Sequence, residues 1–373
     1  MIIVSAFIIS PYLFPKISQE PKEIEQEDII SYELKKSITK LSPILNVTVL
    51  DKDGNLKAQQ IKEDDLIMAN FLQFFTALLW DSNGATRTTT MYDNGGTLRT
   101  IYIYGDEVTF FNEFFTVDAG GYIGIGNGTT APTRSDYSLE SIQESIVVPS
   151  TPGYLSGLVA ISASWSVTSN YSVSEVAFFE KWISSTDPYY FMIMRDTFTP
   201  ISVVEGDQVF CSYNIWLNNT GFTDNFGKFL AGIFQNTQTD KTMSFTDVTG
   251  VNRTFYVYSD HLTAKNAQLN YATDSRIYFA MGENDTVGRT QYQLGAMIGS
   301  YVGASQPTHN NTAVILSASQ TMPGTYDIDT AGLFVQWADT GSTPRIIMFW
   351  KLNFTAVSVY DGYTMTVAFR LLT

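Results

Sequence analysis

Residues 175–182 read EVAFFEKW, and residues 330–337 read TAGLFVQW. The two stretches share an apolar pattern and end on the same residue type, Trp182 and Trp337. The similarity extends in both directions at an offset of 154 to 156 residues, so that 99–104 (RTIYIY) returns as 253–258 (RTFYVY) and 198–203 (FTPISV) returns as 354–359 (FTAVSV). Mostly aromatic, aliphatic and turn residues recur. The repeat therefore preserves a scaffold, which favours a structural or binding role over catalysis.

Each copy of the repeat is predicted to be a β domain. Runs of β-prone residues alternate with clusters of Gly, Asn, Asp and Pro such as 93–96 (DNGG), which is the pattern of short strands and tight turns. The predicted strands of the first copy are about 86–92, 98–104, 107–117, 121–126, 143–148, 157–168, 171–181, 189–198 and 208–217. A short helix is expected before each set of strands, running from Leu66 to Leu79 with a cap at Asp64 or Asp65 in the first copy, and from Asp224 to Phe234 in the second.

A unit of about 150 residues is long enough to bury its own core. We therefore predict a mainly β protein with two tandem, similar β-sandwich domains of jelly-roll type at 44–219 and 220–373. An N-terminal arm, 1–43, precedes them with an apolar tail and a short helix.

The arm is apolar at first and charged afterwards. Residues 1–13 are too short to span a bilayer, which takes about 20 residues, and they lack the basic region of a signal peptide. Apolar residues recur at helical spacing within 16–41, which predicts a helix that Pro43 ends. We expect the arm to anchor the protein to a partner subunit or to an internal membrane. The alternative is that the tail adds to its own domain as an extra strand. The anchoring residues would be Ile2, Ile3, Phe7, Ile8, Leu13, Phe14, Ile30, Leu34 and Ile38.

The composition argues against nucleic-acid binding. The chain has 37 acidic and 22 basic residues and a net charge of −15, whereas binding to phosphates requires clustered Lys and Arg. Charged residues make up only 16% of the chain, and Thr, Ser and Asn are abundant. A polar but weakly charged surface is typical of extracellular and virion proteins. The single cysteine, Cys211, excludes intrachain disulfides and is expected to be a buried, inert thiol.

No motif for catalysis, cofactors or metals is recognised. The two histidines, His261 and His309, lie in polar segments, and the first copy has no histidine. The glycines of 124–128 (GIGNG) resemble a dinucleotide loop, but 129–133 (TTAPT) forbids the helix that such a loop requires. The acidic stretch 51–55 (DKDGN) is interpreted as a hairpin turn and not as a calcium loop. Glu175 returns as Thr330, so no carboxylate pair is repeated. We predict no enzymatic activity, no cofactor and no metal.

The first copy, over 51–217, resembles structural proteins of viruses that infect bacteria and archaea. The resemblance is carried by the order and spacing of several short elements, namely 53–54 (DG), 65–66 (DL), 70–72 (NFL), 123–133 (IGIGNGTTAPT), 136–139 (DYSL), 173–179 (VSEVAFF), 195–198 (RDTF), 203 (V), 206–207 (GD) and 213–215 (YNI). The second copy departs from it, because Arg195 and Asp196 become Lys351 and Leu352 and the TTAP element is missing. The resemblance implies a β-sandwich virion component without enzymatic activity. The duplication and the Thr- and Asn-rich composition also resemble vertex (penton) or turret proteins of turreted icosahedral archaeal viruses.

We therefore expect a viral structural protein on the exterior of the virion. It would build a capsid vertex or turret through oligomeric contacts. The expected partners are further copies in a closed ring, such as a pentamer at an icosahedral vertex, other capsid proteins, an internal viral membrane reached by the N-terminus, and a host receptor; no nucleic acid is expected. One alternative is a receptor- or glycan-binding module like a spike or tail fibre, which Trp165 or Trp182 at a loop tip would favour. A surface-layer or pilus subunit is another alternative.

Overall fold

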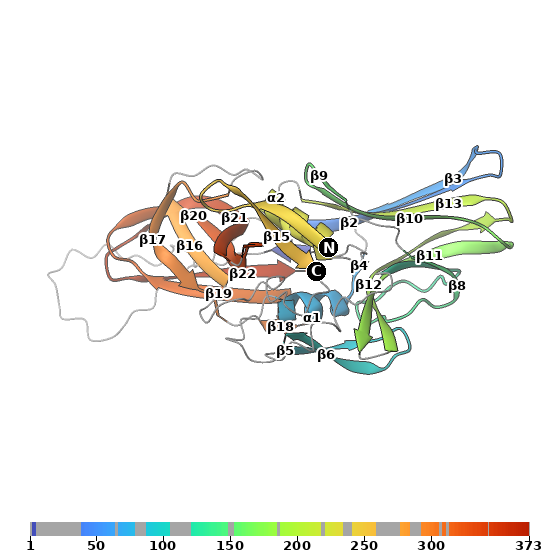
Figure 1. Ribbon diagram of the computed structural model, residues 1–373, viewed down its shortest axis with the longest axis horizontal. Coiled ribbons are helices and arrows are strands. Elements are labelled where there is room, and N and C mark those ends of the chain that lie inside the picture. The colour runs from blue at the N-terminus through green and yellow to red at the C-terminus, as the bar shows by residue number, and fades with distance from the viewer. Residues whose placement is uncertain are drawn as a thin grey trace, which may run out of the picture.

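The computed structural model describes residues 2–4, 39–63, 66–78, 87–104, 121–147, 153–184, 187–217, 221–233, 241–258, 277–283, 292–305, 308–310, 313–341 and 343–372. These residues form a mainly β protein, as predicted, with several antiparallel sheets and two short helices, α1 (Ala69–Leu78) and α2 (Asp224–Ile233). The molecule is elongated (Figure 1), and most strands of the first copy lie toward one end of its long axis while most strands of the second lie toward the other.

The two copies contain the same elements in the same order. In the first, α1 is followed by β5 (Arg87–Tyr92), β6 (Leu98–Tyr104), β7 (Tyr122–Gly126), β8 (Ile142–Val147), β9 (Gly153–Leu155), β10 (Leu158–Ser166), β11 (Tyr171–Ser184), β12 (Asp187–Val203) and β13 (Gln208–Trp216). In the second, α2 is followed by β14 (Lys241–Thr246), β15 (Asn252–Tyr258), β16 (Ile277–Glu283), β17 (Ala296–Gly303), β18 (Thr308–Asn310), β19 (Ala313–Thr321), β20 (Tyr326–Ala338), β21 (Pro344–Val359) and β22 (Thr364–Leu372). The predicted strands of the first copy correspond to β5–β8 and β10–β13, whereas the prediction for 107–117 falls outside the described residues and β9 was not predicted.

The N-terminal part adds β1 (Ile2–Val4), β2 (Thr39–Leu50), β3 (Leu56–Glu63) and β4 (Leu66–Ile67). In the first copy, one sheet has the order β2-β13-β10-β9 with β3 on the outer side of β2, and the other has the order β4-β12-β11-β7-β8. In the second copy the corresponding orders are β22-β19-β18 and β17-β16-β20-β21. Strand β1 pairs with both β2 and β22, so one nine-stranded sheet passes through both copies.

The irregular strand pairing around the stretch 175–182 occurs again in the second copy. The register of β11 against β12 shifts between Val173 and Glu175 and again between Phe178 and Phe179. The register of β20 against β21 shifts at the positions 155 residues later, between Ile328 and Thr330 and between Leu333 and Phe334. A bulge inserts a residue, bends the strand and increases its twist. The repeated sequence therefore encodes the same bent strand pair twice.

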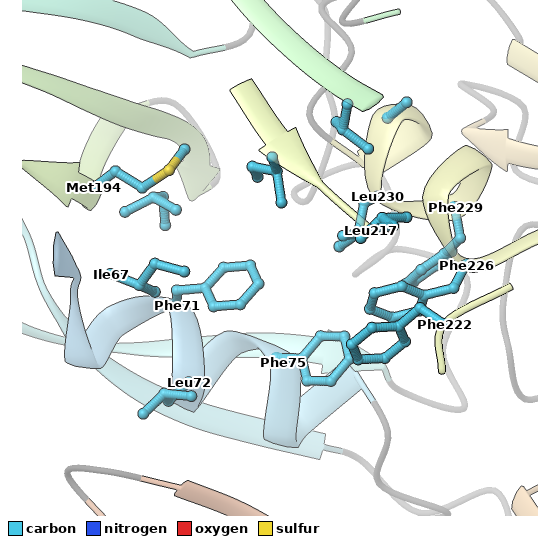
Figure 2. Packing of buried hydrophobic residues seen from close by; sticks show 14 of the residues in the cluster. Ile67, Phe71, Leu72, Phe75, Met194, Leu217, Phe222, Phe226, Phe229 and Leu230 are labelled. Atoms are coloured by element: carbon cyan, nitrogen blue, oxygen red, sulfur yellow. The ribbon is translucent and has the colours of Figure 1, made fainter. Parts of the chain in front are cut away.

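The two copies share one continuous hydrophobic core. Its main cluster of buried residues includes side chains from the sheets of both copies and from both helices. Phe75 of α1 points toward the aromatic residues of α2 (Figure 2), and its ring meets the Phe226 ring edge-on at 6.0 Å between centroids. Phe222 stacks on Phe226 at 4.0 Å. Aromatic pairs of this geometry stabilise a core by about 1 kcal/mol each beyond their buried area.

The contact between the copies is reciprocal. Helix α1 contacts β18 and β19 of the second copy, while α2 contacts the equivalent strands β9 and β10 of the first. Tyr154 on β9 donates a hydrogen bond to the Asp224 carboxylate at the start of α2, and a Cβ added at Gly227 would collide with the Tyr154 ring. Contacts in which each partner uses the same surface are typical of two-fold dimers. The duplication therefore behaves as a dimer within one chain.

The N-terminal prediction needs one correction. Thr39–Leu41, predicted as the end of a helix, instead belong to β2 and pair with Ile2–Val4 of β1. Pro43 lies inside β2 at the point where pairing with β1 has ended and pairing with β3 has not begun, so its missing N–H removes no bond to a described strand on that side. The hydrogen bonds of β2 with strands on both sides thus favour a strand over the helix that the spacing of apolar residues predicted.

Of the residues predicted to anchor the protein, the structure describes only Ile2 and Ile3. Both lie in β1, which is an added strand of the protein's own sheet, as the alternative had it. Phe7, Ile8, Leu13, Phe14, Ile30, Leu34 and Ile38 lie outside the described residues. The prediction that Asp64 or Asp65 caps the first helix is wrong, because Leu66–Ile67 form β4 and α1 begins only at Ala69. The expectation that Asp224 begins a helix is confirmed. In the described part of the chain, no helix is both long and apolar enough to cross a membrane.

Candidate functional site

A buried cluster of charged side chains lies where β11 and β12 meet the end of β7. Glu175 of β11 is fully buried, and Arg195 of β12 is almost so. Oε1 of Glu175 accepts hydrogen bonds from the backbone N–H groups of Gly128 at 3.0 Å and Ser141 at 2.9 Å. Its Oε2 accepts one from the backbone N–H of Glu140 at 3.2 Å and one from Nη2 of Arg195 at 2.9 Å. Both oxygens of this carboxylate are thus satisfied.

Arg195 links Glu175 to a second carboxylate. Its Nη1 donates to Oδ2 of Asp136 at 2.5 Å, and its Nη2 also donates to the carbonyl oxygen of Thr130 at 3.2 Å. Desolvation of buried charges is costly unless each one is paired and hydrogen-bonded, and here every charge is both. The guanidinium therefore joins two strands to the loop that contains Thr130 and Asp136.

The glycines of the 124–128 motif make room for this cluster. A Cβ at Gly126 would collide with Oε1 of Glu175 and would lie 2.6 Å from the carbonyl oxygen of Ser141. A Cβ at Gly128 would lie 2.5 Å from both Oε1 of Glu175 and the Cβ of Glu140. The interpretation of this motif as the end of a strand is confirmed, because β7 ends at Gly126. The glycines are needed because a carboxylate packs directly on the backbone.

The cluster fixes the loop 127–141, which we call the clamped loop. Oε2 of Glu140 accepts the backbone N–H groups of Thr129 and Thr130, and the hydrogen bond from Thr130 lowers the pKa of the Glu140 carboxyl below its usual value. Asp136 accepts the backbone N–H of Thr133 at 2.9 Å and its hydroxyl at 2.6 Å. The side chains exposed on this loop are Asn127, Thr129, Thr130, Ala131, Thr133, Ser135, Tyr137 and Glu140. The result is a hydrogen-bonded loop that presents hydroxyl groups to solvent.

These groups are suited to holding the loop and not to acid–base catalysis. A general base needs an oxygen that can reach a proton on a substrate. Glu175 is shut off from solvent, and Asp136 accepts hydrogen bonds from Arg195 and Thr133 on its two oxygens. The cluster can therefore fix the backbone of the loop that contains Thr130 and Asp136.

The described residues of the second copy do not repeat this cluster of Glu, Arg and Asp. Its residues at the positions of Glu175 and Arg195 are Thr330 and Lys351, and the hydroxyl of Thr330 donates to Asp329. The segment 284–291, which would match the centre of the clamped loop, lies outside the described residues. The residues of the charge cluster thus occur in the first copy, on strands that both copies have.

An exposed aromatic patch adjoins the clamped loop. Tyr137 of the loop and Tyr92 at the end of β5 are both exposed, with ring centroids 6.0 Å apart, and Leu98 lies opposite Tyr92 in the β5–β6 hairpin. In the second copy the residues that match Tyr92 and Leu98 are Thr246 and Asn252, which form a side-chain hydrogen bond of 2.7 Å. The patch is therefore also specific to the first copy.

Three hairpin turns are held by an aspartate and the arginine six residues later, a pattern that the sequence analysis missed. In each turn one carboxylate oxygen accepts two backbone N–H groups and the other accepts Nε of the arginine; the pairs are Asp93–Arg99, Asp247–Arg253 and Asp339–Arg345. Burial alone would raise the pKa of Asp247, but hydrogen bonds from Thr249 and Arg253 outweigh it and lower the pKa. The sequence signal was an Asp six residues before an Arg, with glycine between them. These turns are structural.

The other sequence-based expectations concern single residues. The interpretation of 51–55 as a hairpin turn is confirmed, because Asp51 accepts the N–H groups of Asp53 and Asn55 between β2 and β3. Cys211 is buried on β13, as predicted, and burial raises the pKa of its thiol. Trp165 is buried in β10 and donates to the hydroxyl of Tyr171 at 3.0 Å, so it is not at a loop tip.

Trp182 lies within β11, and His261 is outside the described residues; His309 lies in β18, where its side chain is not described. Among the residues that the structure describes, no group of three His, Cys, Asp or Glu side chains is placed to hold a metal ion.

Comparison of the whole chain with protein-family models, with curated proteins and with solved structures finds no match in any of the three.

Proposed function

We propose that the protein is a structural component of the exterior of a virion. It consists of two tandem β-sandwiches of jelly-roll type, and it builds a capsid vertex or turret through contacts with further copies and with other capsid proteins. The observation that carries this proposal is the charge cluster of Glu175, Arg195 and Asp136. The side chains of this cluster form hydrogen bonds that hold the backbone of the clamped loop. A loop held in this way suits a contact surface and not a reaction.

The shared scaffold supports the proposal. In the first copy, β13 and β11 come from the two sheets, and the hydroxyl of Tyr213 on β13 donates to the carbonyl oxygen of Val176 on β11 at 2.9 Å. Buried side chains alternate along β10 and β13, and they join those of β11 and β12 in one cluster. Two such layers in each copy, connected through α1 and α2, make a rigid rod suited to an exterior structure.

Residues 5–38 of the N-terminal arm serve as the anchor in this proposal, since Ile2 and Ile3 belong to β1 of the protein's own sheet. They attach the rod to the capsid or to an internal membrane, and the clamped loop of the first copy faces a neighbouring subunit or a host receptor. The second copy extends outward, with a polar surface at the positions where the first has its aromatic patch.

Purified particles of the virus that encodes this chain provide the test. Mass spectrometry of the particles is expected to find the chain at a stoichiometry comparable with other capsid proteins. Antibodies raised against the 247–251 turn should label intact particles in electron micrographs, because Thr249, Gly250 and Val251 are exposed. Absence of the chain from purified particles would refute the proposal.

A second function, recognition of a glycan or receptor, is favoured by the aromatic patch. Two exposed tyrosine rings beside a hydroxyl-bearing loop can stack on a sugar and hydrogen-bond to it. A glycan array with the full chain is the measurement, and the double variant Tyr92→Thr/Leu98→Asn, which installs the residues of the second copy, is the matched control. Loss of binding in this variant supports recognition, and equal binding by both proteins contradicts it.

A further inference from the structure

The outer face of one sheet of the first copy carries no charge over three neighbouring strands. Side chains of β2, β13 and β10 alternate between the core and the outside, and Figure 1 shows these strands together in one layer. The fourteen outward residues are Ile44, Asn46, Thr48, Leu50, Gln208, Phe210, Ser212, Asn214, Trp216, Leu158, Ala160, Ser162, Ser164 and Ser166. Charged residues are mostly exposed in proteins, and this chain has 37 acidic and 22 basic ones, so their absence from this face indicates a contact surface.

The central strand of this face, β13, bears two exposed aromatic rings. Phe210 is 39% exposed and Trp216 is 42% exposed. They are six residues apart on the same side of the strand, which separates them by about 20 Å. Ser212 and Asn214 lie between them on that side, and Thr48 of β2 lies opposite Phe210. Flat apolar rings and hydrogen-bonding groups therefore follow one another along a single stripe, which we call the β13 stripe.

The second copy shows that the fold does not require the β13 stripe. Strands β10 and β13 pair as β19 and β22 do, with Ser164 opposite Phe210 where Ser319 is opposite Thr366. The residues that match Phe210, Asn214 and Trp216 are Thr366, Arg370 and Leu372. The hydroxyl groups of Ser319 and Thr366 bond to each other at 2.7 Å. The inward residues remain apolar and buried in both copies, so the two strands differ in their outward chemistry.

The amide groups beside the stripe are already oriented. Oδ1 of Asn46 accepts hydrogen bonds from the Thr48 hydroxyl at 3.3 Å and from Nε2 of Gln59 on β3 at 3.4 Å. Nδ2 of Asn214 donates to the Ser212 hydroxyl at 3.1 Å. Among the described residues, Nδ2 of Asn46, Oε1 of Gln59 and Oδ1 of Asn214 have no partner. One end of each amide is thus held while the other is available, and groups ordered in advance lose less entropy when a ligand binds.

The chemistry of this face selects one class of ligand. Nucleic acids and acidic sugars require Lys or Arg, and calcium requires carboxylates, and none of these occurs among the fourteen residues. Protein interfaces are depleted in serine, whereas β10 presents three serines here. A neutral oligosaccharide matches both components of the face. Its C–H groups pack on the electron-rich faces of aromatic rings, and its hydroxyl groups donate to and accept from amides.

We propose that the β13 stripe, together with the adjoining outward residues of β2 and β10, binds a neutral oligosaccharide along its length. Phe210 and Trp216 stack on two of its sugar rings, and Asn46 and Asn214 bond hydroxyl groups between them. The stripe lies on other strands than the aromatic patch of Tyr92 and is a separate site. The inference goes beyond the virion role and does not depend on it.

Isothermal titration of the full-length protein with maltohexaose, cellohexaose, chitohexaose and mannohexaose tests the proposal. At least one of these hexasaccharides is expected to bind, and glucose is expected to bind far more weakly because it covers only one ring. Phe210→Thr and Trp216→Leu, which install the residues of the second copy, should each weaken binding about tenfold. Binding should also protect wild-type tryptophan fluorescence from acrylamide quenching, and Trp216→Leu should abolish this protection.

Two variants serve as matched controls. Tyr360→Leu removes an aromatic residue of the second copy that is 57% exposed, and Tyr92→Thr/Leu98→Asn removes the aromatic patch. Both should bind the hexasaccharide like the wild type. Circular dichroism and thermal unfolding identical to the wild type establish that each variant is folded.

Four results would overturn the inference. The first is a wild type that binds none of the four hexasaccharides, and the second is unchanged affinity in Phe210→Thr/Trp216→Leu. The third is tighter binding of a heparin-derived hexasaccharide than of any neutral one. The fourth is self-association of the wild type in analytical ultracentrifugation that Phe210→Thr abolishes, since the face would then hold another copy. None of them affects the virion role, which mass spectrometry of particles tests separately.

Discussion

Replacing Arg195 by methionine tests whether the buried charge cluster holds the clamped loop. The substitution keeps most of the side-chain volume but removes the guanidinium that bonds Glu175, Asp136 and the carbonyl oxygen of Thr130. Glu175 would then be a buried anion without a cation. Loss of one partner from a buried ion pair costs about 3–5 kcal/mol of unfolding free energy. The three backbone N–H groups that still reach the Glu175 carboxylate place this variant near the lower limit, at about 3 kcal/mol.

Urea unfolding of the full chain, followed by tryptophan fluorescence, measures this loss. The matched control is the double variant Glu175→Gln/Arg195→Met, in which the buried anion becomes a neutral amide. Because the uncompensated charge is gone, the double variant should be more stable than Arg195→Met by about 1–2 kcal/mol. Limited proteolysis should cut both variants within 127–141 faster than the wild type. A loss below about 1 kcal/mol in Arg195→Met, or a double variant that is less stable than the single one, would refute the reasoning.

Three further substitutions test other parts of the structure. Glu180 on β11 has an enclosed carboxylate oxygen without a partner among the described residues, and burial raises its pKa from 4.5 to about 8. Its folded-state pKa lies above the unfolded value, so its contribution to stability is complete below pH 4.5 and is lost as the pH rises toward 8. Glu180→Val should remove this loss and gain up to about 4 kcal/mol at pH 8 in urea unfolding. Gly126→Ala should cost about 3 kcal/mol in the same assay, because the new methyl group collides with the Glu175 carboxylate. Asp247→Asn should lower the free energy of unfolding by about 1 kcal/mol at neutral pH, because it weakens the turn held with Arg253. Folding lowers the pKa of Asp247, so the wild type is the more stable protein above pH 3.8, and this difference disappears as acid protonates the carboxylate.

Each of these variants has its own control. The stability of Glu180→Val relative to the wild type should vanish at pH 4, and a constant difference across the pH range would contradict the assigned cause. Gly54→Ala, at a turn glycine with open space around it and φ of 84°, should cost only about 1 kcal/mol from backbone strain, and an equal loss at Gly126 would exclude the collision. For the turn, Arg253→Met should reproduce most of the loss in Asp247→Asn, and the two losses should not add.

The repeat made much of the fold predictable from the sequence. The apolar alternation of 208–217 specifies a strand with one buried face, since a slip by one residue would expose every core side chain, whereas 173–179 are buried on both faces of their sheet. The start of α2 at Asp224 was predicted, and the hydroxyl of Thr223, which accepts the backbone N–H of Phe226, caps the helix locally. The first residues of β2, Thr39–Leu41, were predicted as helix because their strand is defined by pairing with distant β1 and not by a local signal.

The sequence by itself determined the two matching sets of strands and turns, because alternation, glycine turns and caps act between residues that are close along the chain. Only the tertiary structure decided which carboxylates are structural. Glu175, Arg195 and Asp136 are far apart in the sequence and meet because β7, β11 and β12 are neighbours in one sheet. It also decided that the two copies share a core, since α1 and α2 each pack on the other copy as well as on their own. These contacts depend on how the sheets are placed in space, and no spacing within the chain reveals that placement.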